Sequence, residues 1–264
     1  MKNDNESIKL YMELLELCGD IVNFVEKTKT YPSQLGFNSL NEECYGLIYE
    51  SLKNVVPRKE LLTKSQKLKE ECPNCWKFYL APRNRSIRIL DIKLGQKFEH
   101  KLIEFFKLKE IDCRKGDEKN KIYPDNVVYK NGEKKAYLEI KYQSAPWIFA
   151  FREEGTSREC YEGSPALDIK KLEQQYKLRE SGEVNVPIYY VYWLDFPCIK
   201  GIFFISVEDM YQYYKEDAKL FDRKEREGDF KTINGKKIKV SATSKIHPSL
   251  FKMGSFNKLM ESLK

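Results

Sequence analysis

Histidine is scarce in this chain of 264 residues, in which only His100 and His247 carry an imidazole group. Histidine-rich metal centres need several such groups, and Ser/His/Asp or Cys/His catalysis needs one that is well placed. The sequence also lacks the GxxxxGKS/T and GxGxxG motifs. These absences argue against triad hydrolases, ATP-driven motors and dinucleotide enzymes, so we expect no nucleotide cofactor.

Long apolar runs are absent as well. No segment approaches the ~18–20 apolar residues that a bilayer-spanning helix needs, and the first ten residues lack the apolar stretch of a signal peptide. Seven cysteines, an odd number without a secretory signal, indicate reduced thiols rather than a disulfide framework. We therefore expect a soluble, cytoplasmic protein with no membrane partner.

The chain does contain enough apolar surface for a core, since 41% of its residues are hydrophobic and 33% are charged, which excludes a disordered chain. Near the N-terminus Ile8, Met12 and Leu15 recur at helical spacing. Later segments alternate strand and helix patterns, and the last part is basic. We predict three parts: a helical N-terminal region (1–90), an α/β core (91–220), and a basic hairpin and tail (221–264).

The middle part predicts a mixed α/β sheet. Phe98, Leu102 and Phe105 recur at i, i+4 and i+7, which indicates an amphipathic helix. Three strands follow, and after them come a helix between residues 165 and 180, two apolar strands and a further helix. Strands that alternate with helices in this order favour a mixed sheet flanked by helices.

The dipeptide Asn131-Gly132 separates two strand-like segments and is a strong signal for a type I′ hairpin. For a two-residue loop at this place, residues whose numbers sum to 263 lie opposite one another. Pro124 then faces Glu139, and Asp125 lies within one pair of it. Because Glu139 and Lys141 are two residues apart, they project from one face of the returning strand. The hairpin thus predicts a corner with two carboxylates and an amine.

Two carboxylates this close repel each other and raise each other's pKa unless a cation lies between them. Mg²⁺ suits such a site, because it binds through one or two carboxylates and a substrate phosphate. A metal ion can polarise a phosphodiester and activate water, and Lys141 can orient that water, help to deprotonate it or stabilise the developing charge. The residue types therefore indicate metal-assisted phosphodiester hydrolysis.

The combination of Pro124-Asp125 with Glu139-Ile140-Lys141 resembles the motif of the PD-(D/E)XK nuclease superfamily, which includes most type II restriction endonucleases. The predicted order of elements matches the αβββαβ core of that superfamily, a restriction-endonuclease-like fold. The resemblance implies that Asp125, Glu139 and Ile140 bind Mg²⁺, for which Mn²⁺ can substitute. It also implies that Lys141 is the catalytic lysine.

Members of the superfamily often add a glutamate from the helix before the hairpin. Glu99 lies at the edge of the apolar stripe of that predicted helix and is the candidate for a further catalytic carboxylate, with Glu104 as the alternative. A competing interpretation of the motif is that Glu139 and Lys141 form the solvated face of a strand and that Pro-Asp is a turn. The hairpin between the two halves and the apolar strands after them favour the nuclease motif.

Two segments are candidates for DNA contact, since a net charge of +7 suits a polyanionic partner. Residues 221–264 hold 11 Lys or Arg and 5 Asp or Glu, and Asn234-Gly235 predicts a second hairpin that could enter a groove of DNA. A solubilising tail is the alternative. A polar loop follows the predicted catalytic strand. The predicted DNA-binding residues are Gln143, Ser144, Arg152, Arg158, Lys231, Lys236, Lys237 and Lys239.

Cys72 and Cys75 are spaced like half of a zinc site. A closed structural site needs four ligands, and no second pair of this kind follows. Cys18 and Cys44 could supply the remaining ligands only through a favourable fold. We therefore favour two ordinary buried thiols over structural zinc.

Together these patterns favour a Mg²⁺-dependent type II restriction endonuclease that cuts double-stranded DNA at a specific sequence. Cutting both strands usually calls for two active sites, so we expect a homodimer. A junction resolvase or a RecB-like exonuclease of the same fold is the alternative enzyme, although the Gln-x-x-x-Tyr of the latter is absent. A DNA-binding module without catalysis is the third hypothesis, against which the complete set of two acids and a lysine argues.

Overall fold

The computed structural model describes residues 5–19, 21, 43, 45–47, 60, 62–70, 88–116, 119–143, 150–151, 159–160, 165–195, 200–216, 230–239 and 245–264. None of the helices in these residues is long and apolar enough to cross a membrane. The helices that pack on the central sheet are α1 (Asn5–Leu17), α6 (Arg88–Leu108), α7 (Ile169–Glu180), α8 (Val207–Glu216) and α9 (Phe256–Leu263), and a 3₁₀ turn, η3, spans Leu250–Lys252.

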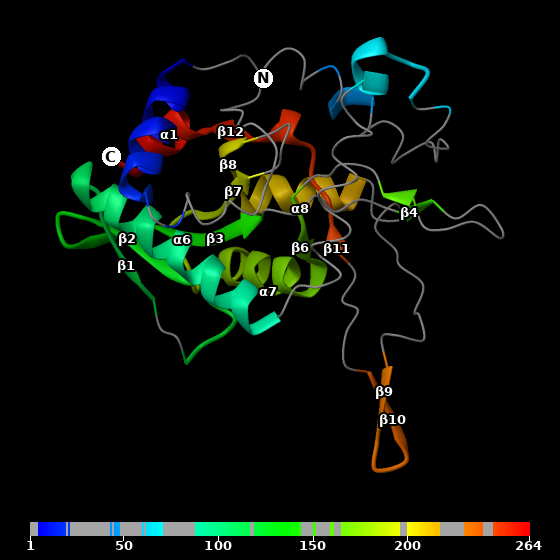
Figure 1. Cartoon of the computed structure of the whole chain (residues 1–264). Coiled ribbons are helices and arrows are strands. Elements are labelled where there is room, and N and C mark those ends of the chain that lie inside the picture. Colours follow the sequence, from blue (N-terminus) through cyan, green and yellow to red (C-terminus); the bar gives the residue numbers. More distant parts are fainter. Residues whose placement is uncertain are drawn as a thin grey trace.

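A six-stranded mixed sheet forms the centre of the fold (Figure 1). Its bounds, in spatial order, are β1 (Asp112–Lys115), β2 (Asn126–Lys130), β3 (Glu133–Gln143), β7 (Ile188–Asp195), β8 (Lys200–Ser206) and β12 (Gly254–Ser255). The neighbours β3 and β7 are parallel, and the other neighbouring pairs are antiparallel. Three short ribbons accompany the sheet: β4 (Ala150–Phe151) with β5 (Glu159–Cys160), β6 (Leu167–Asp168) with β11 (Lys245–Ile246), and β9 (Phe230–Ile233) with β10 (Lys236–Lys239).

The order of the elements confirms the predicted mixed α/β fold with an αβββαβ core. After α6 come β1, β2 and β3, then α7 and β7, and finally β8 and α8. The parallel pairing of β3 with β7 follows from the crossover through α7, because parallel strands need a connection of helical length. This crossover brings α7 within side-chain reach of β3, where Lys171 contacts Glu139.

Alternation of the side chains along the strands separates two hydrophobic cores, one on each face of the sheet. Helices α1, α6 and α9 cover one face, here called the α6 face, and helices α7 and α8 cover the other, here called the α7 face. In β7, Val191 and Trp193 belong to the core of the α6 face, whereas Tyr190 and Tyr192 belong to that of the α7 face. Because both faces are covered, β7 consists of apolar and aromatic residues up to its last residue, Asp195.

The hairpin between β2 and β3 forms as predicted. Its turn residues Asn131 and Gly132 have φ angles of 54° and 82°. Two successive positive φ angles are those of a type I′ turn, in which glycine and asparagine are favoured because few other residues tolerate this backbone conformation. The strongest local signal in the sequence therefore gives the correct connection.

The register of this hairpin differs from the prediction by one residue. A β-bulge shifts the pairing between Val128 and Tyr129, so that Asn126 faces Leu138. The same register extended by one residue puts Asp125, and not Pro124, opposite Glu139. The predicted sum of 263 holds only for the pairs next to the turn. Beyond the bulge the residue numbers of each pair sum to 264.

Helix α1 lies within the predicted helical region, but its buried face differs from the predicted one. Leu10, Tyr11 and Leu14 are buried, whereas Met12 is 43% exposed. The ring of Tyr11 packs edge-on against Trp193 of β7, whose indole N–H donates a hydrogen bond to the tyrosine hydroxyl at 3.2 Å. This long-range contact sets the rotation of the helix, so α1 is part of the core on the α6 face.

The C-terminal segment contributes both to the core and to the predicted basic hairpin. Strand β12 pairs with β8, and α9 buries Phe256 and Leu259 on the α6 face. The hairpin exists as β9 and β10 around Asn234-Gly235, both with positive φ, and it stands away from the sheet in Figure 1. The sequence analysis anticipated this hairpin but not the apolar helix that follows it.

Substitution of Leu14 tests the position of α1 in the core. Because Leu14 is fully buried, Leu14→Ala should lower the free energy of unfolding by about 2–5 kcal/mol. The control Met12→Ala removes an exposed side chain from the same helix and should change it by less than about 0.5 kcal/mol. Urea unfolding followed by circular dichroism measures both values, and equal effects would contradict the observed rotation of α1.

Candidate active site

Strand β3 presents the predicted acid and lysine on the α7 face. Leu138 and Ile140 are buried in the core of the α6 face, and the residues between and after them, Glu139 and Lys141, point to the opposite side. Glu139 is 0% exposed, whereas the side chain of Lys141 is 35% exposed. The two residues therefore run from the protein interior toward solvent along one strand.

Asp125 directly precedes β2, and the charge of Glu139 acts on its carboxyl group. Asn126, the first residue of β2, pairs with Leu138, the residue before Glu139. Extension of this antiparallel register by one residue would set Asp125 against Glu139. The two carboxylates predicted from the sequence are thus brought together.

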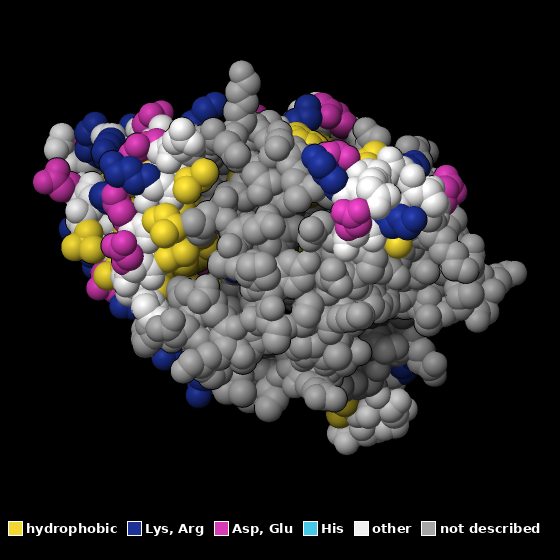
Figure 2. Space-filling view, turned by 45° about the horizontal axis from the view of Figure 1, so that its top comes forward, with side chains coloured by type: hydrophobic (Ala, Val, Ile, Leu, Met, Phe, Trp, Pro, Cys, Tyr) yellow, Lys and Arg dark blue, Asp and Glu magenta, His cyan; other side chains and the backbone are white. Residues whose placement is uncertain are grey.

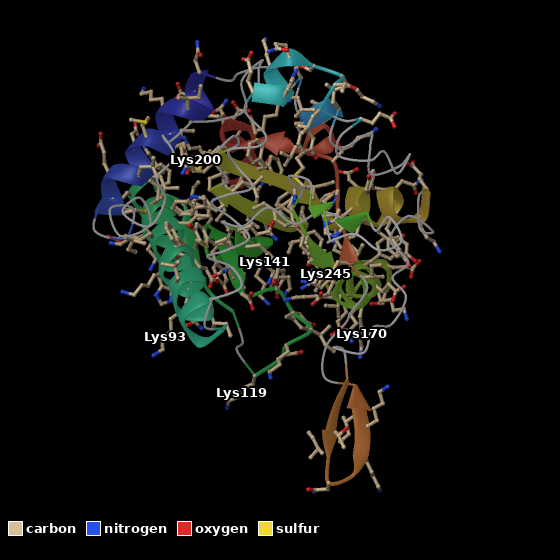
Figure 3. All side chains as sticks on the ribbon, turned by 45° about the vertical axis from the view of Figure 1, so that its right-hand side comes forward. Lys93, Lys119, Lys141, Lys170, Lys200 and Lys245 are labelled. Carbon is tan, nitrogen blue, oxygen red and sulfur yellow. The ribbon has the colours of Figure 1, made fainter. Side chains whose placement is uncertain are left out.

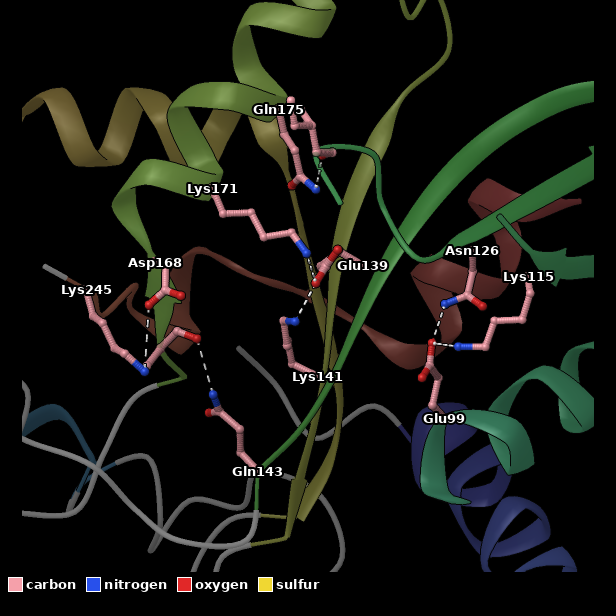
Figure 4. A network of polar contacts seen from close by, with 12 residues as sticks. Glu99, Lys115, Asn126, Glu139, Lys141, Gln143, Asp168, Lys171, Gln175 and Lys245 are labelled. Carbon is pink, nitrogen blue, oxygen red and sulfur yellow. Dashed lines mark hydrogen bonds and ion pairs between the residues drawn. The ribbon is translucent and has the colours of Figure 1, made fainter. Parts of the chain in front are cut away.

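Helix α7 adds a residue that the sequence analysis missed. Lys171, in the first turn of α7, places its Nζ 2.6 Å from Oε1 of Glu139. The ammonium group of Lys141 contacts the same oxygen, so two cations converge on one carboxylate oxygen (Figure 4). The other oxygen, Oε2 of Glu139, is buried and has no hydrogen-bond partner among the described residues.

The charges in this cluster determine which groups are ionised. Burial opposes ionisation of Glu139, but the ammonium groups of Lys141 and Lys171 outweigh it and lower the pKa of the carboxyl group. Burial likewise opposes the charged form of Lys141, but the carboxylates of Glu139 and Asp125 outweigh it and raise the pKa of the amine. Glu139 and Lys141 therefore form an ion pair at neutral pH.

Whereas the pKa of Glu139 is lowered, that of Asp125 is raised. The residue is exposed as a whole, but the protein around its carboxyl group removes part of the hydrating water. This desolvation, followed by the negative charge of Glu139, raises the pKa of Asp125, and Lys171 and Lys141 oppose the rise only in part. The site thus contains an acid whose ionisation an added cation would favour.

The two carboxylates fit a hard divalent cation. Among the described residues, no group of three or more His, Cys, Asp or Glu side chains could hold a metal ion. Mg²⁺ does not require such a group, because it binds through one or two carboxylates and keeps several waters. Asp125 and the buried Oε2 of Glu139 are suitable oxygen ligands. The side chain of Ile140 is buried and apolar, so only its main-chain carbonyl could take part.

Glu99 makes its hydrogen bonds outside this cluster, although its charge still raises the pKa of both Asp125 and Lys141. Its Oε1 accepts hydrogen bonds from the ammonium group of Lys115 at 2.6 Å and from the side-chain amide of Asn126 at 2.8 Å. Figure 4 shows this group to one side of β3, apart from Glu139 and Lys141. A catalytic role for Glu99 therefore stays a prediction. The alternative, Glu104, pairs with Lys101 on the exposed side of α6.

The predicted DNA-binding residues are described only in part. Gln143 donates its amide to the main-chain oxygen of Ala166 at 3.3 Å, which ties the end of β3 to the segment before β6. Lys236 and Lys237 are exposed on the hairpin. Cys18, considered as a further zinc ligand, is buried. The positions outside the described residues, or with side chains outside them, are Ser144, Arg152, Arg158, Lys231, Lys239, Cys44, Cys72 and Cys75.

The position of Lys171 carries a signal that sequence reasoning could have used. The positive end of the helix dipole disfavours basic residues in the first turn of a helix. The first turn of α7 contains Lys170 and Lys171 and no acidic residue. A nearby carboxylate is a simple physical reason for such an exception, and here Glu139 supplies it.

Comparison with known proteins gives a limited likeness. No protein-family model and no curated protein sequence matches the chain. Among solved structures, Hjc, a Holliday junction resolvase of the archaeal hyperthermophile Archaeoglobus fulgidus, aligns with 63% of this chain and 95% of its own. The sequence identity is 12% and the TM-score is 0.35. At these values the likeness supports no argument about function. Any such argument must come from the side chains of the candidate site.

In metal-free buffer, Asp125→Asn should stabilise the protein at neutral pH. Because the pKa of Asp125 is raised in the folded state, ionisation of this residue at neutral pH disfavours folding, and a neutral asparagine removes that penalty. The gain should disappear below the pKa of aspartate in the unfolded chain, where the carboxyl group is protonated in both states. Thermal unfolding in EDTA as a function of pH measures the difference.

Asp112→Asn is the matched control, with the opposite sign. A hydrogen bond from Arg114 lowers the pKa of Asp112, so the ionised form favours folding at neutral pH. Its replacement should leave stability unchanged or slightly reduced, because an exposed ion pair contributes little. A loss of stability in Asp125→Asn would contradict the electrostatics described for the site.

Proposed function

We propose that the protein is a Mg²⁺-dependent endonuclease that hydrolyses phosphodiester bonds of double-stranded DNA. One observation carries the proposal: Asp125 directly precedes β2, beside the buried Glu139 whose charge acts on its carboxyl group, and the partly exposed Lys141 contacts Glu139. Two hard oxygen ligands and an adjoining ammonium group are what metal-assisted phosphodiester hydrolysis requires. The αβββαβ order of the core elements supports the same interpretation.

Each residue has a role that its position supports. Asp125 and Glu139 would hold the divalent cation, which would supply Lewis-acid polarisation of the scissile phosphodiester. Lys141 is an ammonium group that reaches solvent from the same face, and it donates hydrogen bonds to negative charge developing on the phosphate oxygens. Leu138 and Ile140 pack the back of the strand and so hold the charged residues at a fixed spacing.

Within this class we propose a type II restriction endonuclease, which cuts at a specific sequence. The proposal is supported by a basic hairpin apart from the sheet, because sequence-specific cleavage needs DNA contacts beyond the metal site. Since cleavage of both strands calls for two sites, we propose a homodimer whose two-fold axis matches a palindromic target. A DNA junction, the substrate in the name of the structural neighbour, is the alternative substrate.

Supercoiled plasmid DNA provides the test of the chemistry. The wild-type protein should cut it with Mg²⁺ or Mn²⁺ and leave it intact in EDTA. Asp125→Ala removes a metal ligand and Lys141→Ala removes the charge-stabilising amine, so each should slow cleavage by at least about 10²–10³-fold. DNA binding, measured by fluorescence anisotropy with Ca²⁺, should remain, because phosphate contacts elsewhere dominate affinity.

Lys97→Ala is the control for the loss of a lysine, since Lys97 is exposed on α6 and should not affect the rate. Undiminished cutting by the Asp125 variant would refute the site. The products distinguish the classes: discrete fragments support site specificity, and cleavage of four-way junctions alone supports a resolvase. Binding of DNA without metal-dependent cleavage would identify a binding module.

The β9–β10 hairpin is the described surface that best fits a DNA contact. Residues 230–239 contain four lysines and no acidic residue, and Thr232 to Ile238 are all exposed. Ile233 and Ile238 are 47% and 44% exposed, and a two-stranded hairpin is only marginally stable by itself, so a bound partner would stabilise it. On the described surface in Figure 2, by contrast, basic and acidic side chains are interspersed.

The double substitution Lys236→Ala and Lys237→Ala should weaken DNA binding and flatten its salt dependence. Each phosphate contact that is lost lowers the slope of log affinity against log salt concentration by about 0.9. The charge-matched control is Lys9→Ala with Lys97→Ala, exposed lysines of α1 and α6. Anisotropy titrations at several KCl concentrations give both slopes, and identical slopes for the two double variants would exclude the hairpin as a contact.

A further inference from the structure

Two ammonium groups share one carboxylate oxygen in the proposed site. Nζ of Lys171 lies 2.6 Å from Oε1 of Glu139, and Lys141 contacts the same atom. A buried carboxylate needs a counter-charge, but a single ammonium group provides one. With Asp125 included, the two acids and two lysines make a cluster of zero formal charge in the metal-free protein. The second lysine thus supplies a charge that a bound cation would otherwise supply.

The two lysines differ in their freedom to leave Glu139. Lys141 is two residues from Glu139 on the same strand and the same face, which keeps the two side chains close to each other. Lys171 comes from α7, and its side chain is 23% exposed, so a change of rotamer can take its ammonium group toward solvent. Its position in the first turn of α7 is also unfavourable for the helix. Of the two, Lys171 is therefore the one that a cation can displace.

We propose that Lys171 is a positioning residue that pairs with Glu139 in the metal-free protein and is displaced when a divalent cation binds. The inference rests on the proposed function for the identity of the metal ligands, Asp125 and Glu139. Since the cation and the ammonium group compete for one carboxylate, Lys171 sets the cation concentration at which the site fills. It also keeps the buried carboxylate paired while no metal is present.

Calorimetric titration with Mn²⁺, without DNA, tests this competition directly. Lys171→Met removes the competing charge and keeps most of the side-chain length, so it should bind Mn²⁺ about tenfold more tightly than the wild type, a difference of about 1.4 kcal/mol. Lys171→Gln should change affinity in the same direction. Lys171→Arg keeps the charge and should stay within about twofold of the wild type.

Lys170→Met is the matched control, because it makes the same change of charge at the preceding residue of the same helix. Lys170 is exposed and lies on the outer side of α7, whereas Lys141 lies toward the centre of the molecule (Figure 3). Its Mn²⁺ affinity should equal that of the wild type. An equal gain in Lys170→Met and Lys171→Met would indicate a general charge effect and would overturn the proposal.

Unchanged or weaker Mn²⁺ binding by both Lys171→Met and Lys171→Gln, in proteins shown to be folded by thermal unfolding, would also overturn it. Asp125→Ala separates this result from failure of the proposed function. If the wild type binds Mn²⁺ and Asp125→Ala does not, the metal site stands whatever the Lys171 variants show. If Asp125→Ala binds Mn²⁺ like the wild type, the proposed function fails, and the inference about Lys171 fails with it.

Discussion

The burial of one negative charge, the carboxylate of Glu139, constrains the structure around it. A charge without contact to water is tolerated only where opposite charges and hydrogen bonds compensate for the lost hydration. Strand β3 supplies one counter-charge from Lys141, and α7 supplies another from Lys171. Helix α7 lies in the crossover that makes β3 and β7 parallel. The topology of the sheet and the charge balance of the site are therefore linked through this helix.

Two polar residues that are adjacent in sequence, Asp125 and Asn126, interact with different carboxylates. The charge of Glu139 acts on the carboxyl group of Asp125, whereas Asn126 donates a hydrogen bond to Glu99. Oε1 of Glu99 accepts hydrogen bonds from two donors, Asn126 and Lys115. Oε2 of Glu139 has no partner among the described residues. On the α6 face the buried Oδ1 of Asn126 likewise has no partner among the described residues.

Local sequence patterns predicted the helices and strands of the core. The strand register, the rotation of α1 and the Lys171–Glu139 contact were missed. The turn at Asn131-Gly132 and the alternation of Leu138 with Glu139 depend on nearby residues and were correct. No distinctive residue in the sequence indicates the bulge beside Val128, so the predicted register was wrong by one residue. The rotation of α1 depends on Tyr11 meeting Trp193, which is 182 residues away. The contact between Lys171 and Glu139 likewise arises only once the crossover has formed.

Several energetically unfavourable features lie close to Glu139. Lysines occupy the first turn of a helix, a buried carboxylate oxygen lacks a described partner, and Asp125 has a raised pKa. Beside them the hydroxyl groups of Tyr190 and Tyr192 are buried and also have no described partner. Each of these features lowers stability, and well-packed apolar residues would do better in a purely structural role. Asp125 and Glu139 are the groups that the proposed metal-dependent hydrolysis would use, and the proposed function would account for their cost in stability.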